Sequence, residues 1–373
     1  MPTPSFAPLG AALRRRIDDG LLPGAVALVH HRGETAYFET FGARVPGGEA
    51  MPRDAVFRIY SMTKPIVSLA ALMLVEQGRL LLSQRVDEWL QAFANQQVLL
   101  PDGRRVPAQR AATVHDLLRH TAGLSYGWEP GLVQDAYQAA RIGSRALTNA
   151  QLTAALGPLP LAHQPGSAWE YSRATDVLGA LLEAVCGEPL GALLQRMVLA
   201  PLGMRDTGFH VPERAHGRIA EPFAQDPQTG AAIALADVTV PAPFESGGGG
   251  LVSTAEDYAR FLALLLGQGT HAGLRLAGRK TIAFMTADHL GAIPAPGAVL
   301  PPGYGFGLGV AVRREAGLAP RLASAGSYGW SGVGGTVFLV DPQEDLFAMV
   351  LAQAPGQLDA LCDLLPNTVI SAL

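Results

Sequence analysis

The sequence predicts an α+β fold, with one mixed lobe of strands and helices built from both ends of the chain and an all-helical lobe between them. Short apolar runs typical of strands occur near both ends of the 373 residues, whereas the middle shows mainly helical patterns. With 49% hydrophobic and 16% charged residues, the chain can form a large core. We expect the mixed lobe at 1–75 and 240–373 and the helical lobe at 76–239.

The first predicted elements are a helix, a hairpin and a second helix. Residues 6–19 have a helical pattern that ends before a glycine. The apolar run 24–30 and the run 35–41 flank a turn at 32–34, which is typical of a β-hairpin. A longer apolar helix is predicted at 62–77 and also stops at a glycine.

The middle of the chain favours helices, and the last hundred residues favour strands again. We expect one strand at 304–312, a hairpin formed by 336–340 and 346–351, and a final apolar helix at 357–371. The run Ser253 to Glu256 has the form of a capping box ahead of another helix. The helices expected in the middle lie near 113–119, 149–156, 173–186 and 189–199.

Charge and hydropathy exclude several classes of function. The net charge is −4 and no long basic block is present, so neither a nucleic-acid partner nor a membrane surface is expected. No apolar run approaches the 18 residues that a bilayer requires. The N-terminus lacks the order of charge, apolar run and cleavage site that marks a secretory signal, so we expect a cytoplasmic protein. Cys186 and Cys362 do not form a disulfide framework and are expected to be reduced and buried.

Ser61 and Lys64 form the first candidate for a catalytic pair. They stand at the start of the helix predicted at 62–77, where unpaired N–H groups and the helix dipole favour developing negative charge. Three residues make almost one turn, so both side chains lie on one face. Lys64 can act as a base only if its pKa falls from about 10.4, which burial achieves. The structural alternative is a capping serine with a surface lysine one turn away.

Ser125 competes for the role of nucleophile. It stands in Gly123–Gly127, which matches the Gly-x-Ser-x-Gly elbow of α/β-hydrolases. That elbow requires a strand before it and a helix after it. Residues 113–120 have a helical pattern instead, and 128–131 have the composition of a loop. We therefore interpret the glycines as loop residues and favour Ser61.

Further motifs follow the Ser-x-x-Lys pair in a fixed order. They are His120–Leu124, Pro165–Ser172, Pro201–Met204 and Gly247–Leu251. In this order and at these spacings, the chain resembles the serine β-lactamase and penicillin-binding-protein superfamily, and more narrowly its class C-like carboxylesterases, known as family VIII. The resemblance extends from the first hairpin to the last helix. It implies a β-lactamase-like fold, with an antiparallel β-sheet flanked by helices, an all-helical lobe, and an active site in the cleft between them.

The resemblance also implies roles for individual residues. Ser61 matches the nucleophile, Lys64 the base, and Tyr171 the tyrosine of the Tyr-x-Asn motif, a proton shuttle to and from the leaving group. A weak alcohol nucleophile needs a base within hydrogen-bond reach, so the trio makes chemical sense. The backbone N–H groups of Ser61 and Val333 would form the oxyanion hole, with Gly332 letting its strand approach closely. Without the neighbouring motifs, we would interpret Tyr171 as an amphipathic residue packed at a lobe boundary.

The chain departs from the family pattern at two motifs. Arg173 replaces the asparagine of the second motif, which removes an amide that holds part of a β-lactam substrate. The third motif, usually Lys-Thr-Gly, is replaced by Trp330–Val333. Lys280 does not supply it, because Ile282 stands where glycine is required, and we interpret Lys280 as a surface residue. Trp330 offers an apolar face instead of a cation, so a neutral ester is the expected substrate.

The remaining candidates are pocket residues rather than ligands for a metal. Tyr126 and Trp128 either line the substrate pocket or pack in a loop. The four glycines 247–250 lack the Lys of a phosphate loop and indicate a close backbone approach near the cleft. The nine histidines include no His-Glu-x-x-His arrangement, so neither a metal nor another cofactor is expected.

The sequence therefore predicts a serine carboxylesterase that hydrolyses short-chain, small-molecule carboxylic esters through an acyl-enzyme. A class C-type β-lactamase or D-alanyl-D-alanine peptidase on the same fold is the nearest alternative. A non-catalytic acyl-binding sensor is the second, against which retention of Ser61, Lys64 and Tyr171 argues. The natural ester, the preferred chain length and the oligomeric state stay open.

Overall fold

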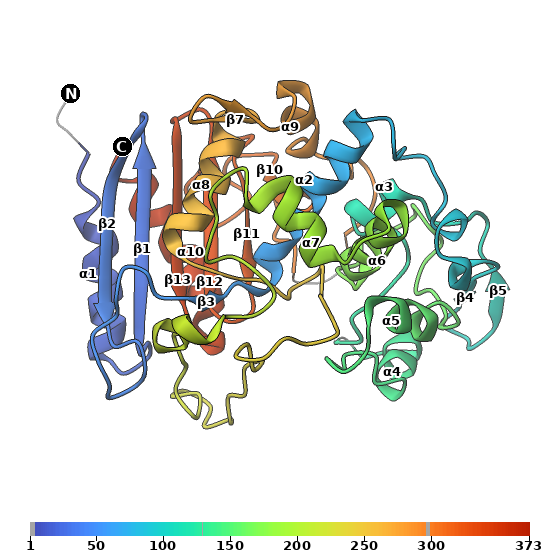
Figure 1. Ribbon diagram of the computed structural model, residues 1–373, viewed down its shortest axis with the longest axis horizontal. Helices are drawn as coiled ribbons and strands as arrows, with labels where there is room; N and C mark the ends of the chain where they lie inside the picture. The colour runs from blue at the N-terminus through green and yellow to red at the C-terminus, as the bar shows by residue number, and fades with distance from the viewer. Residues whose placement is uncertain (1–3, 129, 296–298) are drawn as a thin grey trace.

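An antiparallel sheet forms the centre of one lobe in the computed structural model, which describes residues 4–128, 130–295 and 299–373 (Figure 1). The strand order is β2-β1-β13-β12-β11-β10-β9. Because β1 pairs with β13 from Ala25 opposite Ala352 to His31 opposite Leu346, both ends of the chain build the sheet. Its strands are β1 (Gly24–His31), β2 (Glu34–Gly42), β9 (Tyr304–Phe306), β10 (Ala311–Arg313), β11 (Tyr328–Gly332), β12 (Thr336–Asp341) and β13 (Leu346–Ala352).

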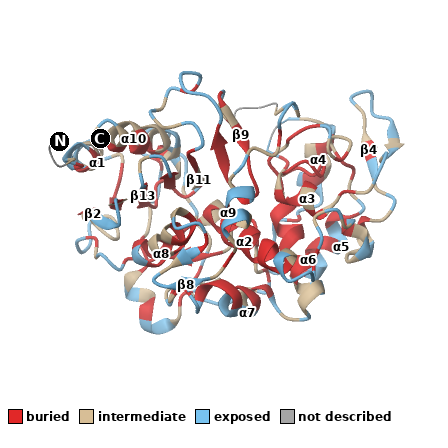
Figure 2. Ribbon diagram, turned by 90° about the horizontal axis from the view of Figure 1, so that it is seen from above, coloured by how far each residue is buried: buried red, intermediate tan, exposed pale blue. Residues whose placement is uncertain are grey.

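Helices cover both faces of this sheet (Figure 2). On one face lie α1 (Ala7–Asp18) and α10 (Leu358–Ile370), and on the other lie α2 (Thr63–Glu76) and α8 (Ala255–Leu266). Alternate side chains of β12 enter the two cores: Leu339 packs with the α1–α10 cluster and Phe338 with the α2–α8 cluster. Every residue of β13 is buried because both of its faces are covered.

The second lobe is helical and packs against α2. In Figure 1 most of its helices lie on the opposite side of α2 from the sheet, and α2 contacts both α6 (Ala174–Cys186) and α7 (Leu190–Leu194) directly. The predicted lobe boundaries stay predictions. Residues between 211 and 238, in the segment predicted for the helical lobe, contribute to a small core together with Val56 and Val252. The helices of the middle segment are α3 (Val114–Leu118), α4 (Leu132–Ala139), α5 (Asn149–Leu156), α6 (Ala174–Cys186) and α7 (Leu190–Leu194), which continues as a π-helical turn at Gln195–Leu199.

Short strand pairs and one further α-helix lie outside the main sheet and the helices named above. Three two-stranded pairs lie outside the main sheet, and α9 (Arg279–Met285) packs against α2. The pairs are β3 (Phe57–Arg58) with β6 (Val252–Ser253), β4 (Gln97–Leu99) with β5 (Arg105–Pro107), and β7 (Thr270–His271) with β8 (Leu274–Arg275).

The fold confirms most predicted elements and corrects two. The single strand predicted at 304–312 is wrong: the chain reverses between β9 and β10, where the Gly307 N–H bonds the Val310 carbonyl and Gly309 adopts a φ of +94°. The predicted capping box is displaced by one residue, since Thr254 caps α8 by accepting from the Asp257 N–H. The helix α4 and the short strand pairs were not predicted. Within the loop predicted at 128–131, Glu129 lies outside the described residues.

Two further expectations concern surface and thiols. Lys280 is exposed on α9, as predicted. Cys186 and Cys362 are free, as predicted, but both are half-buried rather than buried. Cys362 faces the pocket described below.

Across the described ranges, no single helix has both the length and the hydropathy needed to cross a membrane. The helix α6 and the stretch 190–199 pass that test of length and composition only as a pair, with an 80° bend between them. In this fold the apolar side of α6 is buried in the core.

Candidate active site

Ser61 lies on a tight turn that leads into α2. Residues Tyr60–Met62 form a 3₁₀ turn, and α2 begins at Thr63. Tyr60 has a φ of +42°, a left-handed conformation that is costly for a residue with a Cβ atom. Strain of this kind persists only where the surrounding structure holds it, and it is frequent at functional sites. The turn places Ser61 in the wall of a pocket.

Lys64 is fully buried one helical turn after Ser61. Its Nζ donates to the backbone carbonyl of Gly248 at 2.6 Å and lies within hydrogen-bond distance of Ser61 Oγ, at 3.0 Å, and of the phenol oxygen of Tyr126, at 3.1 Å. Three polar partners therefore fix the amine in a site without solvent. The proximity of Ser61 and Lys64 agrees with the spacing argument from the sequence.

These three contacts suit a neutral amine. Such an amine has two N–H donors and one lone pair, and the Gly248 carbonyl can only accept a hydrogen bond. If Tyr126 accepts the second N–H, the lone pair is directed at the hydroxyl of Ser61. Burial lowers the pKa of Lys64 from 10.5 to about 7, so the neutral form is well populated at neutral pH. The geometry therefore has what a general base for Ser61 requires.

Tyr171 is the second titratable group beside Ser61. Its phenol oxygen accepts a hydrogen bond from Trp330 Nε1 at 3.1 Å, and Lys64 Nζ lies 4.5 Å from the centre of its ring. Burial raises the pKa of Tyr171 above its usual value, and hydrogen bonds with Ser61 and Trp330 offset only part of this increase. Tyr171 is therefore a neutral phenol at pH 7, which suits a proton donor.

The end of β11 packs against the turn that carries Ser61. A Cβ atom at Gly332 would collide with the carbonyl oxygen of Ile59, two residues before Ser61, so only glycine permits this approach. The next residue, Val333, is 51% exposed and lines the same pocket as Ser61. The Ser61 turn and the residue after β11 thus border one pocket, as the expected oxyanion hole requires.

Tyr126 and Trp128 form a stacked aromatic pair at the pocket. Their ring centres are 4.3 Å apart and their planes differ by 5°. Trp128 lines the pocket with 61% of its surface exposed, whereas Tyr126 lies behind it and contacts Lys64. The sequence left open whether these two residues line the substrate pocket or pack in a loop, and it gave no sign that Tyr126 contacts Lys64.

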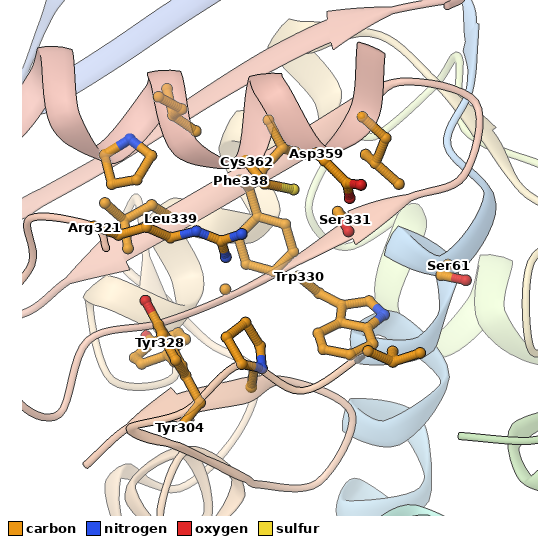
Figure 3. Close-up of a pocket in the computed structure, with 18 of the residues that line it drawn as sticks. Ser61, Tyr304, Arg321, Tyr328, Trp330, Ser331, Phe338, Leu339, Asp359 and Cys362 are labelled. Carbon is orange, nitrogen blue, oxygen red and sulfur yellow. The ribbon is translucent and has the colours of Figure 1, made fainter. Parts of the chain in front are cut away.

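The pocket beside Ser61 has a volume of about 380 Å³ and mainly apolar or aromatic walls. In the view of Figure 3, Ser61 lies at one end, Trp330 in the middle, and Arg321 with Tyr304 at the other end. The Arg321 Nε donates to the carboxylate of Asp363 at 2.7 Å. Of the residues expected from the sequence, the pocket is lined by Ser61, Trp128, Tyr171, Trp330 and Val333, whereas Gly332 and Tyr126 stand behind its walls.

The competing serine has a different environment. Ser125 is buried, and its hydroxyl accepts a hydrogen bond from the Gly127 N–H at 3.0 Å, a local turn contact. It follows a short helix, α3, and a loop rather than a strand, and Gly123 and Gly127 both have positive φ. The glycines therefore serve loop geometry, as the sequence indicated.

No metal centre is evident in the part of the chain that the structure describes. Within it, no group of three or more His, Cys, Asp or Glu side chains is arranged to hold a metal ion. His115 and His289 do approach each other, with Nε2 and Nδ1 2.9 Å apart, but this is a hydrogen bond between α3 and the segment that follows α9.

The sequence missed two groups that support Lys64. The Gly248 carbonyl is one, and the Asp176 carboxylate, which holds Gly248 in place, is the other. The run of four glycines at 247–250 indicates a close backbone approach near the cleft, but it does not show that the Gly248 carbonyl contacts Lys64. Gly247 and Gly248 do approach α6 closely, since a Cβ at Gly248 would lie 2.9 Å from Asp176 Oδ1.

The fold and this site together define a serine hydrolase of the β-lactamase fold. The sequence profile of the β-lactamase family matches residues 9–367. The chain belongs to the serine β-lactamase superfamily and, within it, groups with the class C-like family VIII esterases.

Individual relatives agree with this placement. The chain is 33% identical to esterase EstB of Burkholderia gladioli, over 92% of this chain and 89% of that one. It is 37% identical to protein Rv1367c of Mycobacterium tuberculosis, over 92% and 88% of the two chains. The solved structure of EstCE1, a hydrolase with promiscuous acyltransferase activity, superposes with a TM-score of 0.82 at 30% identity and covers 98% of both chains.

Proposed function

We propose that this protein is a carboxylesterase that cleaves short-chain carboxylic esters through an acyl-enzyme on Ser61. The observation that carries the proposal is the buried Lys64 Nζ, 3.0 Å from Ser61 Oγ, with burial lowering its pKa to about 7. A serine hydroxyl is a weak nucleophile and needs a base that is unprotonated at the working pH. Lys64 lies within hydrogen-bond distance of Ser61, and its lowered pKa makes the unprotonated amine available near neutral pH.

The first half of the proposed reaction forms the acyl-enzyme. Lys64 accepts the Ser61 proton as Oγ bonds to the ester carbonyl carbon, and the N–H groups of Ser61 and Val333 stabilise the oxyanion. The bond between that carbon and the alcohol oxygen then breaks. The alcohol oxygen takes the Tyr171 phenol proton, and the Lys64 ammonium passes the proton that it took from Ser61 to the Tyr171 phenolate.

The second half runs the same proton transfers with water. Water gives a proton to Lys64, directly or through Tyr171, and its oxygen bonds to the acyl carbon. The bond from that carbon to Ser61 Oγ breaks, and the serine oxygen takes the proton held by Lys64. The carboxylic acid leaves, and the site returns to its starting protonation. Neutral Tyr171 is consistent with donation in the first half, because burial raises its pKa.

The pocket favours neutral esters. Trp330 presents an indole where related β-lactamases carry the lysine of the third motif, and it donates to Tyr171 rather than to a substrate carboxylate. The cation at the far end, Arg321, is already paired with Asp363. Trp128 offers an exposed aromatic face on the same pocket, which suits an apolar acyl or aryl group.

Serine variants test the proposal most directly. Ser61→Ala and Lys64→Ala are expected to abolish hydrolysis of p-nitrophenyl butyrate, while Ser125→Ala retains most of it. Mass spectrometry after a brief exposure to the ester should find the acyl group on Ser61. Full activity in Ser61→Ala would refute the proposal. A stable adduct that is never released would instead favour an acyl-binding sensor.

A lactam comparison separates the nearest alternative. Turnover of a chromogenic cephalosporin should be much slower than turnover of an aryl butyrate. A strong preference for the lactam would contradict the argument from Trp330 and favour a β-lactamase or D-alanyl-D-alanine peptidase.

Acyl transfer is a second candidate activity, favoured by the apolar pocket walls beside Ser61. EstCE1, which is similar over the whole chain, is described as having promiscuous acyltransferase activity. If an apolar alcohol enters this pocket in place of water, benzyl alcohol added to an aryl butyrate reaction should yield benzyl butyrate. Formation of butyric acid alone at all alcohol concentrations would exclude it.

A further inference from the structure

A buried carboxylate, Asp176, and a partly buried guanidinium, Arg173, lie at the start of α6. The Asp176 carboxylate is 1% exposed and accepts hydrogen bonds at Oδ1 from the Gly248 N–H at 2.9 Å and from Ser246 Oγ at 2.6 Å. Arg173 Nη1 lies 3.4 Å from the other carboxylate oxygen. The guanidinium of Arg173 also lies 5.4 Å from the centre of the Tyr126 ring. The Asp176 carboxylate thus links α6 to the segment 246–250, which contains the four glycines.

The same glycine carries the contact to Lys64. The N–H of Gly248 bonds Asp176, and its carbonyl accepts from Lys64 Nζ at 2.6 Å. A Cβ atom at this position would lie 2.9 Å from Asp176 Oδ1 and 3.0 Å from the Tyr126 phenol oxygen. Only a glycine lets these groups converge. The position of the carbonyl that orients Lys64 therefore depends on Asp176.

We propose that Asp176 and Arg173 act as a pair of positioning residues for Lys64: Asp176 fixes the Gly248 carbonyl that orients the amine, and the two opposite charges together set its electrostatic environment. The proposal rests on the proposed role of Lys64 as the base. It also gives a purpose to Arg173, which points toward Asp176 and Tyr126 and is absent from the pocket wall.

The charges around Lys64 support this assignment. After burial, the largest influences on the Lys64 pKa are Asp176, which raises it, and Arg173, which lowers it. The other titratable groups facing Lys64 are neutral. Burial raises the pKa of Tyr126 and of Tyr171, and burial together with the Lys64 charge keeps the pKa of His120 well below its usual value. The balance therefore depends on the α6 pair.

The test uses the full-length protein and reads the pH dependence of Ser61 acylation. The second-order rate of labelling by a fluorophosphonate probe is measured from pH 5 to 9, because this step needs the base but no particular ester. Asp176→Asn keeps the shape and an acceptor oxygen but removes the charge. The acid limb of the pH–rate profile, where labelling slows as Lys64 becomes protonated, should therefore move to lower pH by about one unit. Arg173→Gln removes the opposing charge, so the limb should move to higher pH.

Controls separate positioning from folding. Ser246→Ala removes one hydrogen bond of the loop without changing charge, so the labelling rate should fall without a shift of the limb. The double variant Asp176→Asn with Arg173→Gln should return the limb close to its original pH. If Asp176→Asn does not fold, as judged by thermal unfolding, the upward shift in Arg173→Gln decides the matter alone.

Failure of this inference is distinct from failure of the proposed function. If Ser61 is labelled in the parent protein but neither folded variant moves the limb, or both move it in the same direction, the role of the α6 pair is refuted. If Ser61 is not labelled at all and Ser61→Ala keeps its esterase activity, the proposed function fails instead.

Discussion

Replacing Lys64 with methionine should stabilise the protein in a manner that depends on pH. Burial lowers the pKa of Lys64 from 10.5 to about 7, a shift that corresponds to about 5 kcal/mol. That energy is the cost of holding a protonated Lys64 in the folded state, whereas the unfolded chain carries the same charge in water. Methionine has a similar length and no charge, so it removes this cost.

The sign of the pH dependence follows from proton binding. Between about pH 7 and 10.5 the unfolded chain binds a proton at Lys64 that the folded protein releases, so the stability of the wild type rises with pH. The advantage of Lys64→Met should therefore be greatest at or below pH 7 and shrink by about 1.4 kcal/mol per pH unit above it. Loss of the hydrogen bonds to Gly248 and Tyr126 subtracts about 1–3 kcal/mol, independently of pH.

Urea unfolding at a series of pH values between 6 and 9.5 measures this difference. Lys280→Met is the matched control, because Lys280 is exposed and its side chain stays in water in both states. The control should differ from the wild type by the same amount at every pH. A difference between Lys64→Met and the wild type that does not change with pH would falsify the reasoning, since it would mean that folding leaves the pKa of Lys64 unchanged.

Three further substitutions probe the pocket. Tyr171→Phe should lower kcat/KM by about 10²–10⁴. The loss should be greater for ethyl butyrate than for p-nitrophenyl butyrate, because a leaving ethoxide needs a proton more than a leaving nitrophenolate does. Equal losses for the two esters would contradict proton donation by Tyr171. Trp330→Lys removes the hydrogen bond to Tyr171 and supplies a cation, so the ratio of cephalosporin to aryl ester turnover should rise; an unchanged ratio would contradict the role of Trp330 in specificity. Gly332→Ala should lower the free energy of unfolding by about 1–3 kcal/mol, and with it the melting temperature and the activity, because the new Cβ collides with the Ile59 carbonyl. A fully active and stable variant would show that the strand can shift freely.

Local patterns in the sequence predicted the elements that carry the site. The hairpin of β1 and β2 and the helix α2 follow from apolar periodicity and from glycines at their ends, signals that lie within a few residues of each other. The placement of Ser61 and Lys64 on one face follows from helix geometry. Tyr171 was found differently, because its approach to Ser61 depends on the whole fold and only the family resemblance indicated it.

The contacts missed by the sequence are those between distant segments. Gly248 lies 184 residues from Lys64 along the chain, and Asp176 lies 72 residues from Gly248. The hydrophobic periodicity of a sequence concerns neighbouring residues and cannot predict such a long-range contact. A contact through a backbone carbonyl also does not depend on the type of side chain, so the residue pattern does not indicate it. The sequence also did not predict the turn between β9 and β10. Glycine occurs within strands as well as in turns, so Gly309 by itself does not indicate a turn, and only its positive φ in the structure does.

The pairing of β1 with β13 has a consequence for how the chain becomes active. During synthesis the strand at residues 24–31 emerges long before its partner at 346–352, so the central sheet cannot close until residues 346–352 have been made. Until then α2 lacks the strands that bury its apolar side, and a nascent chain exposes that surface to aggregation. A chain shortened before residue 346 should therefore be captured by chaperones instead of acquiring partial activity.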